Sequence, residues 1–194
     1  MRGIDVSENN GEVDFQAVKN AGYDFVIVRL GYGNCHLDSN FYRNVNGALD
    51  AGLKIGVYYY DYGLDVIDAQ NQAAFTLMVL LDCGLKPERL EMGVWYDMED
   101  ADSWKHKHGM PNNATLTNMC SAFVEKCRTY GYDCGVYSCL DWLENRIVVN
   151  RLPADTKLWC AQYNRSCDYS GAYMWQYTAS ANIDGRYFDA NVLL

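Results

Sequence analysis

The feature that most constrains the fold is an alternation of apolar segments of strand length with amphipathic segments of helix length. Apolar runs occupy residues 3–7, 25–33, 54–62 and 92–99, and each is followed by a stretch whose apolar residues have helical spacing. Strands that are apolar throughout are typical of parallel sheets buried on both faces, with helices as connections. We therefore expect helices at 13–22, 41–52, 65–84 and 114–131. Most of them end at a glycine, and the last begins with a threonine that can cap its N-terminus.

The second half of the chain departs from this alternation. Further strands are expected at 134–139, 157–163, 173–178 and 188–193, and the last three follow one another too quickly for full helices between them. About eight strands favour a closed or nearly closed barrel, with an open α/β sheet as the alternative. We therefore expect an α/β fold, an irregular (β/α) TIM-like barrel whose helices are reduced in the C-terminal half. No linker, low-complexity tract or repeat interrupts residues 1–194, which indicates a single domain.

Acidic residues gather where strands are expected to end. The run "GVWYDMED" at 93–100 places Asp97 and Glu99 on one face of a strand, with Cα atoms roughly 6.5 Å apart. Asp100 should point the other way or lie in the following loop. Further acids at or near the ends of predicted strands are Asp5, Asp61 and Asp189. Working sites of parallel α/β folds lie at the carboxyl ends of the strands, so these acids are candidates for chemistry.

Two neighbouring carboxyls suit the hydrolysis of a glycosidic bond. One must carry a proton for the leaving oxygen, and another must stay ionised to support the developing positive charge. Carboxylates held close together push their pKa values apart, which allows this division at mild pH. The same oxygens could instead cap a helix or bind Mg²⁺ or Ca²⁺. His106 and His108 could bind metal, but a solvated loop is the better interpretation, and we expect neither a cofactor nor a metal.

Charge and composition exclude several functions. The net charge of −9 argues against nucleic acid and against docking on anionic membranes. Apolar runs are too short to span a membrane, and the first residues, MRGIDVSENN, lack the apolar region of a signal peptide. Sixteen Tyr and five Trp suffice to line a sugar-binding cleft as well as to fill a core.

The eight cysteines form no C-x-x-C motif, so zinc-ribbon and thioredoxin-like hypotheses fail. Cys120 and Cys127 are two helical turns apart on one face, which suggests buried thiols rather than a bonded pair. Mostly free thiols are therefore expected, with one or two disulfides in an exported protein as the alternative.

Several motifs together resemble the glycoside hydrolase family 25 lysozymes, and the likeness runs nearly from end to end. They are "GIDVSENNGEVDF", "VKNAGYDFVIVRLGYG", "DSNFYRNVNGALDAGLKIGVYYY", "VWYDMED", "GVYS", "LWCAQY", "MWQYT" and "FDANVL", in family order. The resemblance implies a barrel with a shortened second half. It also implies cleavage of the β-1,4 bond between N-acetylmuramic acid and N-acetylglucosamine in peptidoglycan, by a monomer acting outside the cell at the bacterial wall. Without a signal peptide, the protein would reach the wall by a phage-type release from the cell, or the chain would be an exported protein whose signal peptide has been trimmed.

The resemblance also assigns roles to individual residues. Glu99 matches the general acid, and Asp97 matches its partner, which orients or stabilises the reacting N-acetyl group or cation. Asp5 and Asp189 match the remaining acids of the family cleft. Whether such enzymes use their own nucleophile or the acetamido group of the substrate is left open. Expected substrate contacts are Tyr60, Tyr58, Tyr137, Trp175, Gln176 and Arg29. For Arg29 a structural ion pair with Asp5 or another acid is the expected main role.

Two alternatives belong to other functional classes. A non-catalytic glycan-binding module would keep the aromatic residues and tolerate loss of Glu99, which this chain retains. A hydrolase of another N-acetylated glycan such as chitin would use the same acids. Many relatives carry a wall-binding repeat module that is not found in these residues.

Overall fold

The long strands of the chain close into a barrel. The computed structural model describes all residues from 1 to 194. One sheet contains nine strands in the order β1-β9-β8-β7-β6-β5-β4-β2-β3, and an additional pairing of β1 with β2 closes the ring and leaves only β3 outside it. The bounds of the strands are β1 Arg2–Val6, β2 Phe25–Tyr32, β3 His36–Leu37, β4 Lys54–Tyr60, β5 Val94–Asp97, β6 Cys134–Cys139, β7 Leu158–Ala161, β8 Met174–Ile183 and β9 Arg186–Leu193. The closed barrel is confirmed and the open sheet is excluded.

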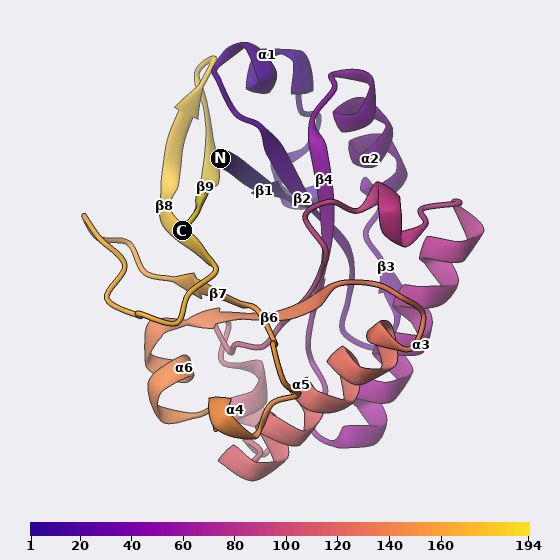
Figure 1. Cartoon of the computed structure of the whole chain (residues 1–194), viewed down its shortest axis with the longest axis vertical. Helices are drawn as coiled ribbons and strands as arrows, with labels where there is room; N and C mark the ends of the chain where they lie inside the picture. The colour runs from indigo at the N-terminus through magenta and orange to yellow at the C-terminus, as the bar shows by residue number, and fades with distance from the viewer.

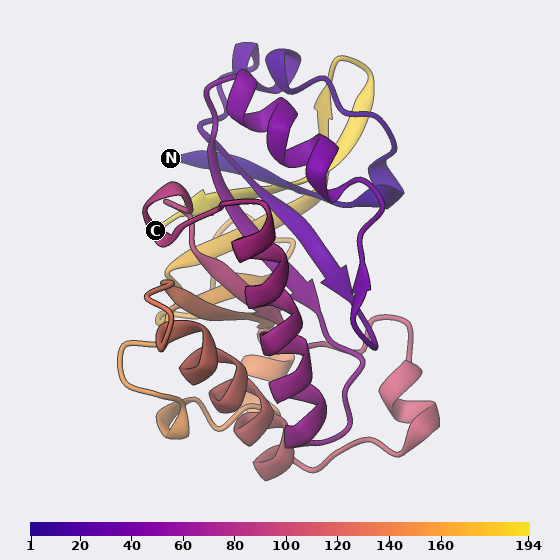
Figure 2. The same cartoon turned by 90° about the vertical axis from the view of Figure 1, so that its right-hand side faces the viewer.

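Helices connect the strands of the first half and cover one side of the barrel (Figure 1 and Figure 2). The four expected helices are present, as α1 Phe15–Asn20, α2 Phe41–Asp50, α3 Val66–Asp82 and α5 Asn113–Arg128. The last of these is capped by the side chain of Asn112, which accepts the amide of Thr115, and not by a threonine. The short helices α4, Trp104–His108, and α6, Leu140–Asn145, were not expected from the sequence.

The second half carries fewer helices, as expected. Only α6 and one short 3₁₀ turn separate β6 from β7, and no helix separates β7 from β8. β8 and β9 form a hairpin whose turn is Asp184 and Gly185, both with positive φ, of 50° and 79°. A two-residue turn of this kind joins antiparallel strands, so β9 runs against both β8 and β1, while the other barrel pairings are parallel.

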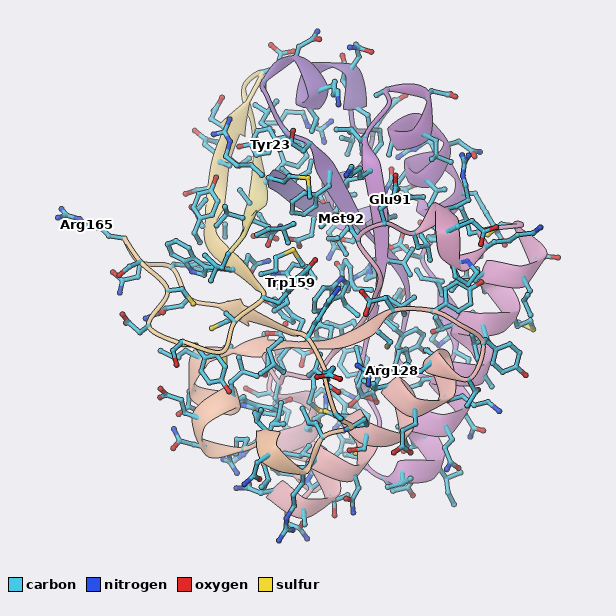
Figure 3. All side chains as sticks on the ribbon, in the orientation of Figure 1. Tyr23, Glu91, Met92, Arg128, Trp159 and Arg165 are labelled. Carbon is cyan, nitrogen blue, oxygen red and sulfur yellow. The ribbon has the colours of Figure 1, made fainter.

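Two apolar clusters fill the molecule. The larger lies between the strands and the helices that surround them, and the smaller lies inside the ring of strands. Met92 and Trp159 belong to the inner cluster and appear in the middle of the barrel in Figure 3. Room for the large rings comes from glycines on neighbouring strands, since a Cβ at Gly3 would lie 2.2 Å from the ring of Phe25. This apolar filling occupies one part of the interior and leaves the polar residues at the other end.

All eight cysteines are free, which confirms the expectation of unpaired thiols; Cys120, Cys127, Cys134 and Cys160 are buried and the other four are partly exposed. None of the helices combines the length and the apolar character that a membrane crossing requires.

Candidate active site

Four carboxyl groups meet at the polar end of the barrel interior. Asp5 lies on β1, Asp97 ends β5, Glu99 follows it by two residues, and Asp189 lies on β9. Asp5 and Asp189 are direct partners in the antiparallel β1–β9 ladder, so their side chains point to the same face. The negative charge of Glu99 reaches both Asp97 and Asp5 strongly enough to raise their pKa values. The four acids named from the sequence are therefore brought together by three strands, β1, β5 and β9, that are far apart along the chain.

Asp5 is held by two amide side chains. Its Oδ2 atom accepts hydrogen bonds from Gln176 Nε2 at 2.9 Å and from Asn191 Nδ2 at 2.8 Å. Burial raises the pKa of Asp5 to about 7, with the neighbouring charge of Asp189 acting in the same direction, although both amide donors favour the ionised form. Asp5 thus changes its charge near neutral pH in a fixed orientation.

Asp97 and Glu99 form the pair that the sequence predicted. β5 ends at Asp97, and the side chain of Met98 between the two acids is fully buried in the outer apolar cluster, which leaves Asp97 and Glu99 on the inner side. Asp97 is 5% exposed, and its Oδ1 atom has no hydrogen-bond partner. Burial, with the charge of Glu99 next, raises the pKa of Asp97 well above its ordinary value. The deeper acid of the pair therefore strongly resists ionisation while Glu99 carries its negative charge.

Glu99 is the acid that faces an open hollow. Burial raises its pKa to about 7, and Asp102, Asp189 and Asp100 add to the rise, whereas Lys105 opposes it. The hollow encloses about 460 Å³. The residues that line it are Glu8, Asn9, Arg29, Tyr32, Tyr60, Tyr62, Glu99, Ala101 and Asp102. A carboxyl that keeps a proton up to neutral pH beside an aromatic wall can donate that proton to a bound polar ligand.

The expected substrate contacts fall into three groups. Tyr60 and Arg29 line the hollow with Glu99. Tyr137 and Gln176 lie deeper, where the hydroxyl of Tyr137 donates to Gln176 Oε1 at 3.0 Å. Tyr58 packs edge-on against Trp159 in the interior, at 6.4 Å between ring centroids.

Trp175 is not brought to the acids. Its neighbours Met174 and Gln176 both point into the barrel, so the alternation of side chains turns the indole outward. There its ring N–H donates to the carbonyl of Gln162 at 2.7 Å. The sequence motif could not show this, because it contains adjacent residues that a strand sends to opposite faces.

Arg29 pairs with acids other than Asp5. Its Nε atom lies 2.7 Å from Asp38 Oδ2, and its Nη2 atom lies 3.1 Å from Glu8 Oε1. The guanidinium also stacks on the ring of Tyr32, at 4.7 Å. The structural role expected for Arg29 is therefore observed, and its charge is largely balanced before any ligand binds.

Two further residues belong to this site that were not expected from the sequence. Asn191 holds Asp5 and accepts the indole N–H of Trp159 at 2.9 Å; its spacing of two from Asp189 was the available signal. Lys105 lies buried beneath Glu99, and the sequence offered no signal for it, because "WKHKHG" has the composition of a solvated loop. No group of three or more His, Cys, Asp or Glu side chains is arranged to hold a metal ion.

Buried acids beside an open aromatic hollow, at one end of an eight-stranded α/β barrel, are chemically suited to the cleavage of a glycosidic bond. The sequence pattern of the family described as glycosyl hydrolases family 25 matches residues 4–186. The chain therefore belongs to glycosyl hydrolase family 25.

Curated relatives agree with this assignment. The chain is 28% identical over 191 residues to the autolytic lysozyme of Clostridium acetobutylicum, an alignment that covers 95% of this chain and 52% of that protein. It is 29% identical over 138 residues to lysozyme-like protein 5 of Caenorhabditis elegans, covering 70% of this chain and 60% of that protein. The chain thus spans little more than half the length of these relatives.

Solved structures share the fold. A family 25 glycosyl hydrolase from Bacillus anthracis superposes with a TM-score of 0.83 at 18% identity, covering 100% of this chain and 88% of that one. A bacterial lysozyme from Streptomyces coelicolor superposes with a TM-score of 0.83 at 21% identity, covering 100% and 91% of the two chains. At these identities the likeness establishes the barrel fold alone.

Proposed function

We propose that this chain is a peptidoglycan-cleaving N-acetylmuramidase that hydrolyses the β-1,4 bond between N-acetylmuramic acid and N-acetylglucosamine. The observation that carries the proposal is Glu99, a mostly buried carboxyl with a pKa raised to about 7 that opens onto an aromatic-lined hollow. Family membership and the lysozyme names of its relatives support the choice of substrate. Residues 1–194 would form one catalytic domain that acts as a monomer at the bacterial cell wall.

The roles follow from depth and charge. Glu99 donates its proton to the glycosidic oxygen, because it is the acid of the Asp97–Glu99 pair that lines the hollow. Asp97, on the same strand and deeper, orients the reacting N-acetyl group or supports the developing cation. Asp5 and Asp189 complete the ring of carboxyls, and each of them, when it is ionised, favours a positively charged transition state in a site of low dielectric.

Sugar rings would stack against the wall of the hollow. Tyr60 and Tyr62 lie 5.0 Å apart at their ring centroids beside Glu99 and offer apolar faces with polar edges. Tyr137 and Gln176 lie closer to Asp5 and would meet the ring next to the scissile bond.

The test is a digest of purified peptidoglycan by the wild type and by Glu99→Gln, with new reducing ends identified by mass spectrometry. We expect muramic-acid reducing ends from the wild type and a loss of at least about 10³-fold in the variant, because glutamine cannot donate the proton. The variant should keep its melting temperature and its binding to glycan. Wild-type products from chitin alone would move the substrate to another N-acetylated glycan, and binding without products would indicate a glycan-binding module.

A further inference from the structure

A lysine lies in the interior directly below the candidate acid. Lys105 belongs to the five-residue helix α4, and it is 1% exposed although both of its neighbours on the helix are more accessible. Lysine is almost never fully buried without partners, because removing an ammonium group from water costs several kcal/mol. The surroundings of this ammonium group must therefore compensate for its burial.

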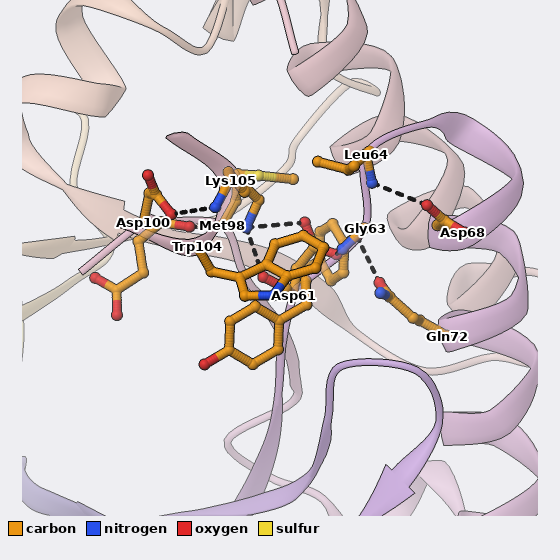
Figure 4. Close-up of polar contacts among 12 residues, drawn as sticks. Asp61, Gly63, Leu64, Asp68, Gln72, Met98, Asp100, Trp104 and Lys105 are labelled. Carbon is orange, nitrogen blue, oxygen red and sulfur yellow. Dashed lines mark hydrogen bonds and ion pairs between the residues drawn. The ribbon is translucent and has the colours of Figure 1, made fainter. Parts of the chain in front are cut away.

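Three contacts surround the Lys105 ammonium group. Its Nζ atom lies 3.4 Å from Asp61 Oδ2 and donates to the main-chain carbonyls of Asp61, at 2.5 Å, and of Glu99, at 2.8 Å. Two of the three donors of the ammonium group are thus used in hydrogen bonds, and the contact with Asp61 Oδ2 is an ion pair. Figure 4 shows the side chain reaching from α4 to the end of β4 at Asp61. Lys105 thereby joins the carboxyl ends of β4 and β5 below the hollow.

The main chain directly after Glu99 is tied to the same helix, α4, by hydrogen bonds of Asp100. Asp100 accepts the backbone amides of Lys105 at 2.7 Å and of His106 at 3.0 Å, so residues 99–105 form a closed loop. The position of Glu99 is consequently fixed on one side by a capping carboxylate and on the other by the lysine.

The charges that face Glu99 are otherwise negative or neutral. Arg29 lines the same hollow, but Asp38 and Glu8 pair with it. The remaining titratable groups around Glu99 come from seven parts of the chain. They are Asp5 on β1, Tyr60 on β4, Asp97 on β5, Asp100 and Asp102 in the loop, Tyr137 and Cys139 on β6, Tyr163 after β7 and Asp189 on β9. Lys105 also pairs with Asp61, but it is the positive charge that lowers the pKa of both Glu99 and Asp97 against their burial.

We propose that Lys105 is a positioning residue of the reaction, which fixes the main chain of Glu99 at the mouth of the barrel and sets the protonation of the acid pair. This inference rests on the proposed function for its kinetic consequences only. Lys105 touches no ligand, since its ammonium group is enclosed by Asp61 and Glu99.

The test compares Lys105→Met with Lys107→Met. Lys107 lies two residues further on the same helix and is exposed, so both variants lose one charge and only one loses the buried contacts. Without Lys105 the pKa values of Glu99 and Asp97 rise, so both acids keep their protons to higher pH. The curve of kcat/KM against pH should therefore shift by about one unit toward higher pH. We expect kcat to fall about tenfold or more with little change in KM, because the acid is misplaced while the binding wall is intact. Lys107→Met should match the wild type.

A second measurement is independent of catalysis. Carbon-detected NMR follows the titration of the Glu99 side-chain carboxyl, identified by its loss in Glu99→Gln, and its midpoint should rise in Lys105→Met but not in Lys107→Met. Should Lys105→Met not fold because Asp61 is left unpaired, the double variant Asp61→Asn/Lys105→Met removes both charges. The Glu99 midpoint should then still rise, but by less, because the negative charge of Asp61 is lost as well.

The outcomes separate the two proposals. A wild type that cleaves no peptidoglycan refutes the proposed function, while the NMR midpoint still decides the role of Lys105. A folded variant lacking Lys105 whose Glu99 midpoint and pH curve coincide with those of Lys107→Met reduces Lys105 to a structural residue and overturns the inference.

Discussion

At the scale of single residues, the site is a set of carboxyls whose burial opposes their ionisation. Asp5 is 7% exposed, and its pKa is raised to about 7. A group whose pKa is higher in the folded than in the unfolded chain favours folding at low pH, because the folded state then holds the extra proton. Its stabilising contribution is complete below about pH 4 and is lost as the pH rises through about 7.

Asp5→Asn should therefore gain stability relative to the wild type as the pH increases from 4 to 8. Asparagine resembles the protonated acid, and its oxygen can still accept from Gln176 and Asn191. We expect the difference in unfolding free energy between the two proteins to change by a few kcal/mol, roughly 1.4 kcal/mol per unit of pKa. Urea unfolding at several pH values measures it. Asp50→Asn, at an exposed position on α2, is the control, and an identical pH trend in both variants would contradict the argument.

At the scale of elements, the β8–β9 hairpin decides where Asp189 lies. Its two-residue turn reverses the chain, so β9 enters the ring against β1 and brings Asp189 opposite Asp5. A crossover helix at this point would have given a parallel last strand with another register. The turn depends on Gly185, whose φ of 79° disfavours any residue with a Cβ atom.

Gly185→Ala should lower the unfolding free energy by about 1–2 kcal/mol, because alanine strains the left-handed backbone. No atom lies within 4 Å of the added Cβ, so the cost is that of the backbone alone. Thermal unfolding measures it, with Asp184→Asn as the control in the same turn, expected within about 0.5 kcal/mol of the wild type since asparagine tolerates this conformation. A neutral Gly185→Ala would show that the turn can change type without disturbing the barrel.

At the scale of the whole molecule, the net charge of −9 would act on its encounter with the proposed substrate, the bacterial cell wall. Bacterial walls that retain anionic polymers would repel such a chain at low ionic strength, and salt weakens this repulsion over a Debye length of about 10 Å at 0.1 M.

The initial rate on walls that keep their anionic polymers should therefore increase between about 10 and 150 mM NaCl. Walls stripped of these polymers serve as the control, on which the rate should vary little with salt. A rate that falls with salt on both substrates would indicate that a local positive patch guides binding instead of the net charge opposing it. Turbidity loss of wall suspensions gives both measurements.

Much of this architecture could be predicted from the order of residues alone. The period of the apolar residues located all the long strands and the four main helices to within a few residues, because each element must bury one face. The same period placed Asp97 and Glu99 on one side of β5. Family motifs named Asp5 and Asp189, which the hydrophobic pattern did not distinguish from other acids on strands.

Tertiary structure alone decided how distant segments meet. The pairing of β1 with β2 closed the ring, and the hairpin at Asp184 reversed β9; both depend on strand partners that no local pattern specifies. Burial of Lys105 and the outward turn of Trp175 likewise follow from what packs around them, while their own sequence neighbourhoods suggested the opposite. The chain's local periodicity determined which elements form and which faces they bury. The pKa values of the carboxyls, by contrast, were set by burial and by the charges of groups, Lys105 among them, that only the closed barrel brings within reach.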